Sequence, residues 1–124
     1  MKMKVITFTA KIAHASKEED YYMIAFADDE FAPKDYIILQ KAFAFDEQDV
    51  QLDMDGEYVE VNGQENSGYK CCKQAILAEN KFVIELAADS GHIERVEVDL
   101  KGLKPPDNLR AYLTQILEGK LIIE

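Results

Sequence analysis

Residues 57–100 read EYVEVNGQENSGYKCCKQAILAENKFVIELAADSGHIERVEVDL, and this stretch decides the fold. Four parts of it are rich in the β-branched and aromatic residues that favour strands. These candidate strands lie near 57–62, 69–78, 82–88 and 93–100. Turn residues separate them at Asn62-Gly63, Asn80-Lys81 and Asp89-Ser90-Gly91. Links this short join antiparallel neighbours, so this half of the chain predicts an antiparallel meander.

The residues before this stretch continue the strand pattern. Residues 6–12 alternate apolar and polar side chains, which predicts one strand. A second strand is expected at residues 22–26, after the charged turn at 17–20. The apolar run at residues 36–39 suits a strand that is covered on both faces.

The last twenty residues predict a helix followed by a short strand. Pro105-Pro106-Asp107 can open a helix, because proline is tolerated in the first turn and a carboxylate there complements the helix dipole. An apolar stripe at helical spacing follows, formed by Leu109, Tyr112, Leu113, Ile116 and Leu117. Gly119 can end the helix, and residues 121–123 can add a strand. The predicted fold class is α+β, an antiparallel β-sheet (meander) with one C-terminal helix packed on it, in a single domain spanning residues 1–124.

The charge of the chain limits its partners. There are 14 basic and 24 acidic side chains, which leaves a formal net charge of −10. Such a field repels nucleic acid and anionic membranes and attracts basic proteins. The acidity is equally compatible with a role in solubility alone. We therefore expect a protein partner, no nucleic acid and no membrane.

The cysteines and the start of the chain favour the cytoplasm. Met1 to Val5 lead directly into a strand pattern, without the apolar segment of a secretion signal. Cys71 and Cys72 are the only cysteines, and neighbours on a strand point to opposite faces and seldom form a disulfide. Reduced thiols in the cytoplasm are expected.

Few residues are suited to catalysis or to metal binding. His14 and His92 are the only histidines, and each is expected on the surface. Residues 51–62 resemble a calcium loop, but Gln51 and Asn62 stand where that loop needs acidic ligands. Glycines match no phosphate-binding fingerprint. The sequence therefore predicts no enzyme activity, no cofactor and no metal.

The acidic segment at residues 46–57 is the candidate partner-binding segment. It is too polar for a core strand and lacks strong helical periodicity. Its carboxylates are Asp46, Glu47, Asp49, Asp53, Asp55 and Glu57. Tyr58 and Tyr69 are the nearest aromatic residues and can anchor an interface, although they can equally cover the sheet.

From Glu19 to Tyr69 several short motifs follow one another in a characteristic order. They are Glu19-Asp20-Tyr21-Tyr22, Ile24-Ala25-Phe26-Ala27-Asp28, Tyr36-Ile37-Ile38-Leu39-Gln40, Asp46-Glu47-Gln48-Asp49, Met54-Asp55, Tyr58-Val59-Glu60-Val61-Asn62-Gly63-Gln64 and Ser67-Gly68-Tyr69. With these motifs the chain resembles the bacterial immunity protein family numbered ten, whose members are found beside polymorphic and contact-dependent toxins. Asp53 and Lys70-Cys71-Cys72 depart from the family pattern.

The resemblance implies a cytosolic immunity protein that binds and neutralises one cognate toxin in a stoichiometric complex. The acidity favours a basic nuclease as the toxin, because a nuclease must be basic to hold its substrate. An acidic adaptor with another basic partner is the alternative, and a small enzyme or a calcium-binding protein comes third. The oligomeric state stays open.

Overall fold

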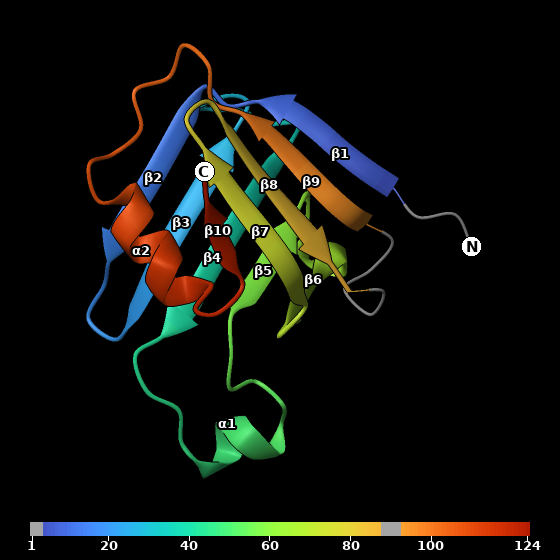
Figure 1. The fold of residues 1–124 in the computed structure, drawn as a ribbon. Coiled ribbons are helices and arrows are strands. Elements are labelled where there is room, and N and C mark those ends of the chain that lie inside the picture. Colours follow the sequence, from blue (N-terminus) through green and yellow to red (C-terminus); the bar gives the residue numbers. More distant parts are fainter. Residues whose placement is uncertain (1–3, 88–92) are drawn as a thin grey trace.

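The computed structural model describes residues 4–87 and 93–124, whose strands form two five-stranded sheets packed face to face (Figure 1). The strands are β1 Lys4–Thr9, β2 Ile12–Lys17, β3 Tyr21–Ala27, β4 Tyr36–Ala42, β5 Tyr58–Val61, β6 Ser67–Tyr69, β7 Cys72–Ala78, β8 Lys81–Leu86, β9 Ile93–Asp99 and β10 Leu121–Ile123. The helices are α1 Glu47–Gln51, the 3-10 turn η1 Gln64–Asn66 and α2 Leu109–Ile116. We call β1-β9-β8-β7-β10 the mixed sheet and β2-β3-β4-β5-β6 the antiparallel sheet.

The α+β class with one C-terminal helix packed on a sheet is confirmed. The expected single meander is corrected to two sheets, of which the antiparallel sheet is a true meander. In the mixed sheet β7, β8 and β9 follow one another in antiparallel order, but β1 pairs with β9 and β10 pairs with β7 in parallel. The difference arises because the chain passes between the sheets at two corners.

The first corner divides the strand expected at residues 6–12 into β1 and β2. Ala10 donates its N–H to Asp99 in the mixed sheet at 2.9 Å, whereas Lys11 donates to Ala27 in the antiparallel sheet at 2.8 Å. Two successive residues thus donate hydrogen bonds to different sheets. Such corners are typical of packed sheets whose strands switch layer.

The second corner divides the strand expected at residues 69–78 into β6 and β7. Lys70 donates its N–H to Glu57 in the antiparallel sheet, and Cys71 accepts from Ala87 in the mixed sheet. Lys70 adopts a left-handed φ of 59°, which turns the chain sharply. Neither Cys71 nor Cys72 forms a disulfide, as expected, and both are buried because Cys71 lies in the corner and not on an exposed strand face.

The hydrophobic core lies between the sheets. Phe26 of the antiparallel sheet and Phe82 of the mixed sheet meet there, with ring centroids 5.4 Å apart. Helix α2 covers part of the same inner face and buries the apolar stripe that its sequence predicts, including Leu113 and Ile116. The helix begins at Leu109, so the two prolines precede its first turn instead of opening it. No helix in the described part of the chain is long and apolar enough to cross a membrane.

Candidate partner-binding surface

The acidic connection between β4 and β5 contains a helix that the sequence did not indicate. We call residues 43–56 the α1 projection, because this segment extends beyond the ends of both sheets (Figure 1). Asp46 accepts a hydrogen bond from the Asp49 N–H at 2.8 Å, and Asp49 accepts one from the Asp46 N–H at 3.1 Å. This reciprocal capping box satisfies two N–H groups that a short helix otherwise leaves unpaired.

Helix α1 buries none of its residues. Val50 and Leu52 are 57% and 59% exposed, although they are apolar. They contribute little to the core, since the helix is held by its cap and by its ends. Single exposed apolar side chains are common on protein surfaces, so Val50 and Leu52 are available to a partner but do not by themselves mark an interface.

The six predicted carboxylates of this segment fall into two sets. Asp46, Glu47 and Asp49, which we call the tip carboxylates, form no ion pair with any residue that the structure describes. The base carboxylates, Asp53, Asp55 and Glu57, are bound by lysines. The sequence alone does not distinguish the two sets.

Lys70 holds two of the base carboxylates. Its Nζ lies 2.9 Å from Asp53 Oδ1 and 2.6 Å from Asp55 Oδ1. The hydrogen bond from Lys70 lowers the pKa of Asp55, and the bonds to Asp55 and Asp53 raise the pKa of Lys70. The Lys70 ammonium group thus lies between two carboxylates that the calcium-loop pattern would use as metal ligands. It also connects the end of the α1 projection to the corner at Lys70.

Glu57 is the third base carboxylate and lies apart from the surface. It is 5% exposed, and its Oε2 accepts from the Cys72 N–H at 3.1 Å and from Lys120 Nζ at 3.0 Å. The side chain therefore connects the start of β5 with β7 and the residue before β10. Its burial removes it from the surface that the other five carboxylates share.

The outer face of the antiparallel sheet adjoins the α1 projection and carries tyrosines. Tyr58 and Tyr69 pair across β5 and β6, with ring centroids 5.2 Å apart. Tyr36 and Tyr58 both donate their hydroxyls to the Glu60 carboxylate at 2.7 Å. Burial and this hydrogen bond raise the pKa of Tyr36 to about 12, and burial raises that of Tyr58.

The run at residues 36–39 is buried on one face only, which corrects the expectation that it is covered on both. Ile37 and Leu39 are fully buried in the core, whereas Tyr36 and Ile38 are half-buried on the outer face. The tyrosines therefore stand on a face that the other sheet does not cover. The structure thus brings together Tyr58, Tyr69 and the α1 projection, as the sequence predicts, and adds Tyr36 and Glu60, which sequence reasoning missed.

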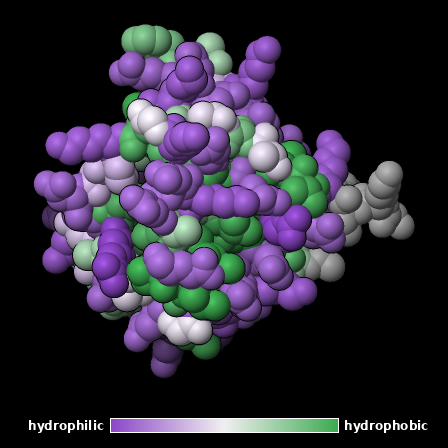
Figure 2. Space-filling view, turned by 45° about the horizontal axis from the view of Figure 1, so that its top comes forward, coloured by the Kyte–Doolittle hydropathy of each residue, from purple (hydrophilic) through white to green (hydrophobic). Residues whose placement is uncertain are grey.

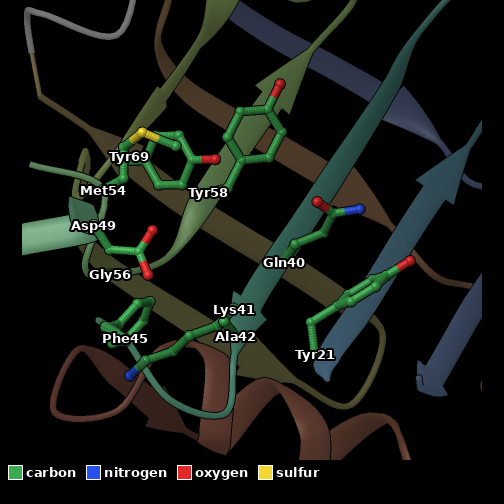
Figure 3. A pocket seen from close by; sticks show the side chains of 10 residues that line it. All are labelled: Tyr21, Gln40, Lys41, Ala42, Phe45, Asp49, Met54, Gly56, Tyr58 and Tyr69. Carbon is green, nitrogen blue, oxygen red and sulfur yellow. The ribbon is translucent and has the colours of Figure 1, made fainter. Parts of the chain in front are cut away.

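A cavity of about 160 Å³ lies where the α1 projection meets this face (Figure 3). Its lining residues are Tyr21, Gln40, Lys41, Ala42, Phe45, Asp49, Met54, Gly56, Tyr58 and Tyr69. We call it the aromatic cavity, because four of these residues carry aromatic rings. Three of the predicted site residues, Asp49, Tyr58 and Tyr69, meet in its wall.

The outer face of the mixed sheet has a different character. Lys81 and Arg95 each bind Glu97 at 3.1 Å, so these three charges are paired within the sheet. Figure 2, turned by 45° from the view of Figure 1, shows hydrophilic and hydrophobic side chains next to one another on the side that it views. Of the two outer faces, the one with the tyrosines is the better candidate for a partner.

The histidines and the cysteines are the residues that the sequence offers as candidates for catalysis. His14 is exposed on β2, and His92 lies outside the described residues. Burial and the charge of Glu57 raise the pKa of the Cys72 thiol to about 12, which disfavours the reactive thiolate. No group of three or more His, Cys, Asp or Glu in the described ranges could hold a metal ion.

Fold and surface together define a class: a small two-sheet domain that presents an acidic projection and a tyrosine-bearing face, as proteins that recognise other proteins do. Comparison with known families agrees, since the model of immunity protein 10 matches residues 9–104 of the 124. The chain belongs to the immunity protein 10 family and is thus an immunity protein, which acts against a toxin. The resemblance seen from Glu19 to Tyr69 is confirmed and extends in both directions. No match to the chain was found among curated proteins.

Proposed function

We propose that this protein neutralises a basic toxin, a nuclease, by forming a stoichiometric complex in the cytoplasm. The contact surface would consist of the α1 projection and the adjoining outer face of the antiparallel sheet. Glu57 is excluded from it by burial, and the other residues predicted from the sequence are retained. The protein would act by binding and would catalyse no reaction.

The tip carboxylates carry this proposal. Three acidic groups within four residues repel one another, and the part of the chain that the structure describes supplies no basic side chain to pair with them. A basic partner surface would supply the missing countercharge. Val50 and Leu52 stand beside them and would be covered by the same partner.

Charged and apolar residues would act on different rates of binding. A nuclease holds a polyanion on a basic surface, so an acidic projection is attracted to the same place. Complementary charges raise the association rate, while buried aromatic and apolar contacts slow dissociation. The substrate would then be excluded because the inhibitor occupies its site.

The test is surface plasmon resonance between this protein and the toxin domain encoded by the neighbouring gene, over a series of salt concentrations. Glu47→Lys should slow association about fivefold at low salt and leave dissociation nearly unchanged, because exposed charges act mainly on encounter. Glu94→Lys is the matched control, since Glu94 is also exposed but lies on β9 in the mixed sheet.

Two outcomes would contradict the proposal. One is that Glu47→Lys and Glu94→Lys slow association equally, which would place the docking surface elsewhere. The other is that the neighbouring toxin domain does not bind at all, which would favour the alternative of an adaptor with a different basic partner. Co-expression provides the functional readout: the wild type should protect cells and nucleic acid from the toxin.

A further inference from the structure

The aromatic cavity has a shape and chemistry that the general acidity of the α1 projection does not explain. Tyr58 and Tyr69 form one wall, from β5 and β6. Tyr21 comes from β3, and Phe45 comes from the segment that leads into α1. Figure 3 shows Tyr58 and Tyr69 together on one side, Phe45 on the side of Asp49, and Tyr21 beyond Gln40. Aromatic rings carry a negative face and attract cations within about 6 Å of their centroids.

Asp49 supplies a negative charge to this space. Figure 3 shows its carboxylate pointing from α1 toward the middle of the lining residues. One oxygen, Oδ2, accepts the capping hydrogen bond from Asp46. No lysine or arginine of the described ranges forms an ion pair with Asp49.

The two lysines nearest the cavity are engaged elsewhere. Lys41 lines the cavity, and its Nζ lies 3.8 Å from Glu118 Oε2, beyond the end of α2. Lys70 is bound to Asp53 and Asp55. The cavity therefore combines an aromatic wall with a carboxylate that its own chain leaves without a countercharge.

The size of the cavity limits the group that fits. Its volume of about 160 Å³ equals roughly five waters at about 30 Å³ each. A guanidinium group with its adjoining methylene contains about five heavy atoms and stacks on aromatic rings better than an ammonium does. Arginine is also enriched among the residues that dominate protein interfaces.

We propose that the aromatic cavity receives an arginine side chain of the toxin, with its guanidinium stacked between the aromatic rings and bound to Asp49. This inference rests on the proposed function, because it takes the toxin as the source of the side chain. It adds a specific anchor to the electrostatic attraction of the tip carboxylates. The interface would then be centred on the cavity, with the tip of α1 beside it.

The experiment uses small probes, so it does not depend on the toxin. Ethylguanidinium chloride is titrated into the ¹⁵N-labelled full chain at constant ionic strength, and backbone amide shifts are followed by nuclear magnetic resonance. N-ethylurea is the matched neutral probe of nearly the same shape. We expect ethylguanidinium to give saturable shifts around Asp49, Tyr58 and Tyr69, with a dissociation constant on the order of 10 mM. N-ethylurea should give none there.

Variants identify the groups responsible. Asp49→Asn removes the charge and keeps an oxygen for the capping hydrogen bond, and it should weaken ethylguanidinium binding about threefold. Tyr69→Leu removes an aromatic face at a residue that is 38% exposed, and it should weaken binding by a similar factor. Glu94→Gln, on the mixed sheet, is the control and should leave binding unchanged.

The outcomes separate this inference from the proposed function. Equal binding of the two probes, or shifts spread evenly over the surface, would overturn the arginine site even if the toxin binds the protein. Saturable binding that Asp49→Asn does not weaken would overturn it as well. If the toxin domain fails to bind while ethylguanidinium binds as described, the cavity is a guanidinium site and the toxin is not the source of its occupant.

Discussion

The tip and the base of the α1 projection differ in how their carboxylates are held. At the tip, three acidic groups have no ion pair with the described residues, and the helix that carries them buries nothing. At the base, three acidic groups are bound by Lys70 and Lys120, and Glu57 is buried. The base carboxylates join the projection to the sheets, while the tip carboxylates are bound by no lysine of the described residues, and two of them cap α1 itself.

This difference shows that acidic density alone does not locate an interface. Lys120 is 63 residues from Glu57 in the sequence, and Lys70 is 17 residues from Asp53. Both pairs depend on how the chain returns to the projection. A carboxylate is available to a partner only when no such lysine binds it. Variants of the base carboxylates should therefore change stability, and variants of the tip carboxylates should change binding.

The largest effect is expected at Glu57. Glu57→Ala should lower the free energy of unfolding by about 2–3 kcal/mol, because it leaves the Cys72 N–H and Lys120 without their acceptor. The value lies below that of a fully buried pair because the Lys120 side chain is 32% exposed. Urea unfolding followed by circular dichroism measures the change.

Glu47→Ala serves as the matched tip variant and should change the free energy of unfolding by less than about 0.5 kcal/mol. Equal urea midpoints for Glu57→Ala and Glu47→Ala would remove the distinction between base and tip. Alkylation gives a second readout, since the buried Cys72 thiol should resist iodoacetamide in the wild type and react faster in Glu57→Ala.

Removing the capping box should destabilise α1 locally, with an effect of intermediate size. Asp46→Ala removes the side chain that accepts from the Asp49 N–H, which corresponds to about 1 kcal/mol of helix stability. Because α1 buries nothing, the loss should appear as about fivefold faster hydrogen exchange at the Asp49 and Val50 amides, with global unfolding nearly unchanged. A large shift of the urea midpoint would show instead that α1 supports the core.

Lys70→Met should have a small effect that depends on pH. In the wild type the pKa of Asp55 is lowered by Lys70, so the pair stabilises the fold above the ordinary aspartate pKa. That stability is lost as pH falls through the lowered pKa of Asp55, because protonation of Asp55 ends the attraction. The variant should therefore be slightly less stable at neutral pH and equal to the wild type in acid.

The measurement is urea unfolding of both proteins between about pH 7 and pH 2, with the Asp55 carboxyl titration followed by nuclear magnetic resonance. The Asp55 pKa should rise toward its ordinary value in Lys70→Met. A stability difference that persists at the acid end would mean that Lys70 acts through packing, as its contact with Gly56 could allow.

The smallest effect on stability is expected at the outermost tip. Glu47→Gln should leave the urea midpoint unchanged and slow association with the toxin domain about twofold at low salt, a difference that high salt should abolish. Stopped-flow mixing at two ionic strengths measures it. A stability change as large as that of Glu57→Ala would show that Glu47 supports the fold as the base carboxylates do.

The sequence predicted the elements whose pattern is local. The apolar stripe of α2 and the alternation in β3 are readable because one face of each is buried. Helix α1 was missed because five residues cannot display a periodic stripe and its capping aspartates look like plain acidity. The left-handed φ of Lys70 was also unreadable, since lysine does not signal that conformation.

For the candidate surface, too, the sequence indicates only those residues that lie close together in the chain. The sequence located the acidic segment and Tyr58 and Tyr69, which lie near one another in the chain. It did not separate Glu57 from the tip, because the partner Lys120 comes from beyond α2. Tyr36 was missed because the apolar run at residues 36–39 concealed which of its side chains face outward, and Glu60 because Tyr36, which donates to it, is 24 residues away in the sequence.

The order of strands in the two sheets sets the order in which they can form during synthesis. The antiparallel sheet uses β2 to β6, which follow one another along the chain, so it can assemble once residue 69 has emerged from the ribosome. The mixed sheet has β10 at one edge and must wait for residues 121–123. Until strands β7 to β9 have emerged, the apolar inner face of the antiparallel sheet is left without its cover, and the growing chain passes through a stage at which aggregation competes with folding.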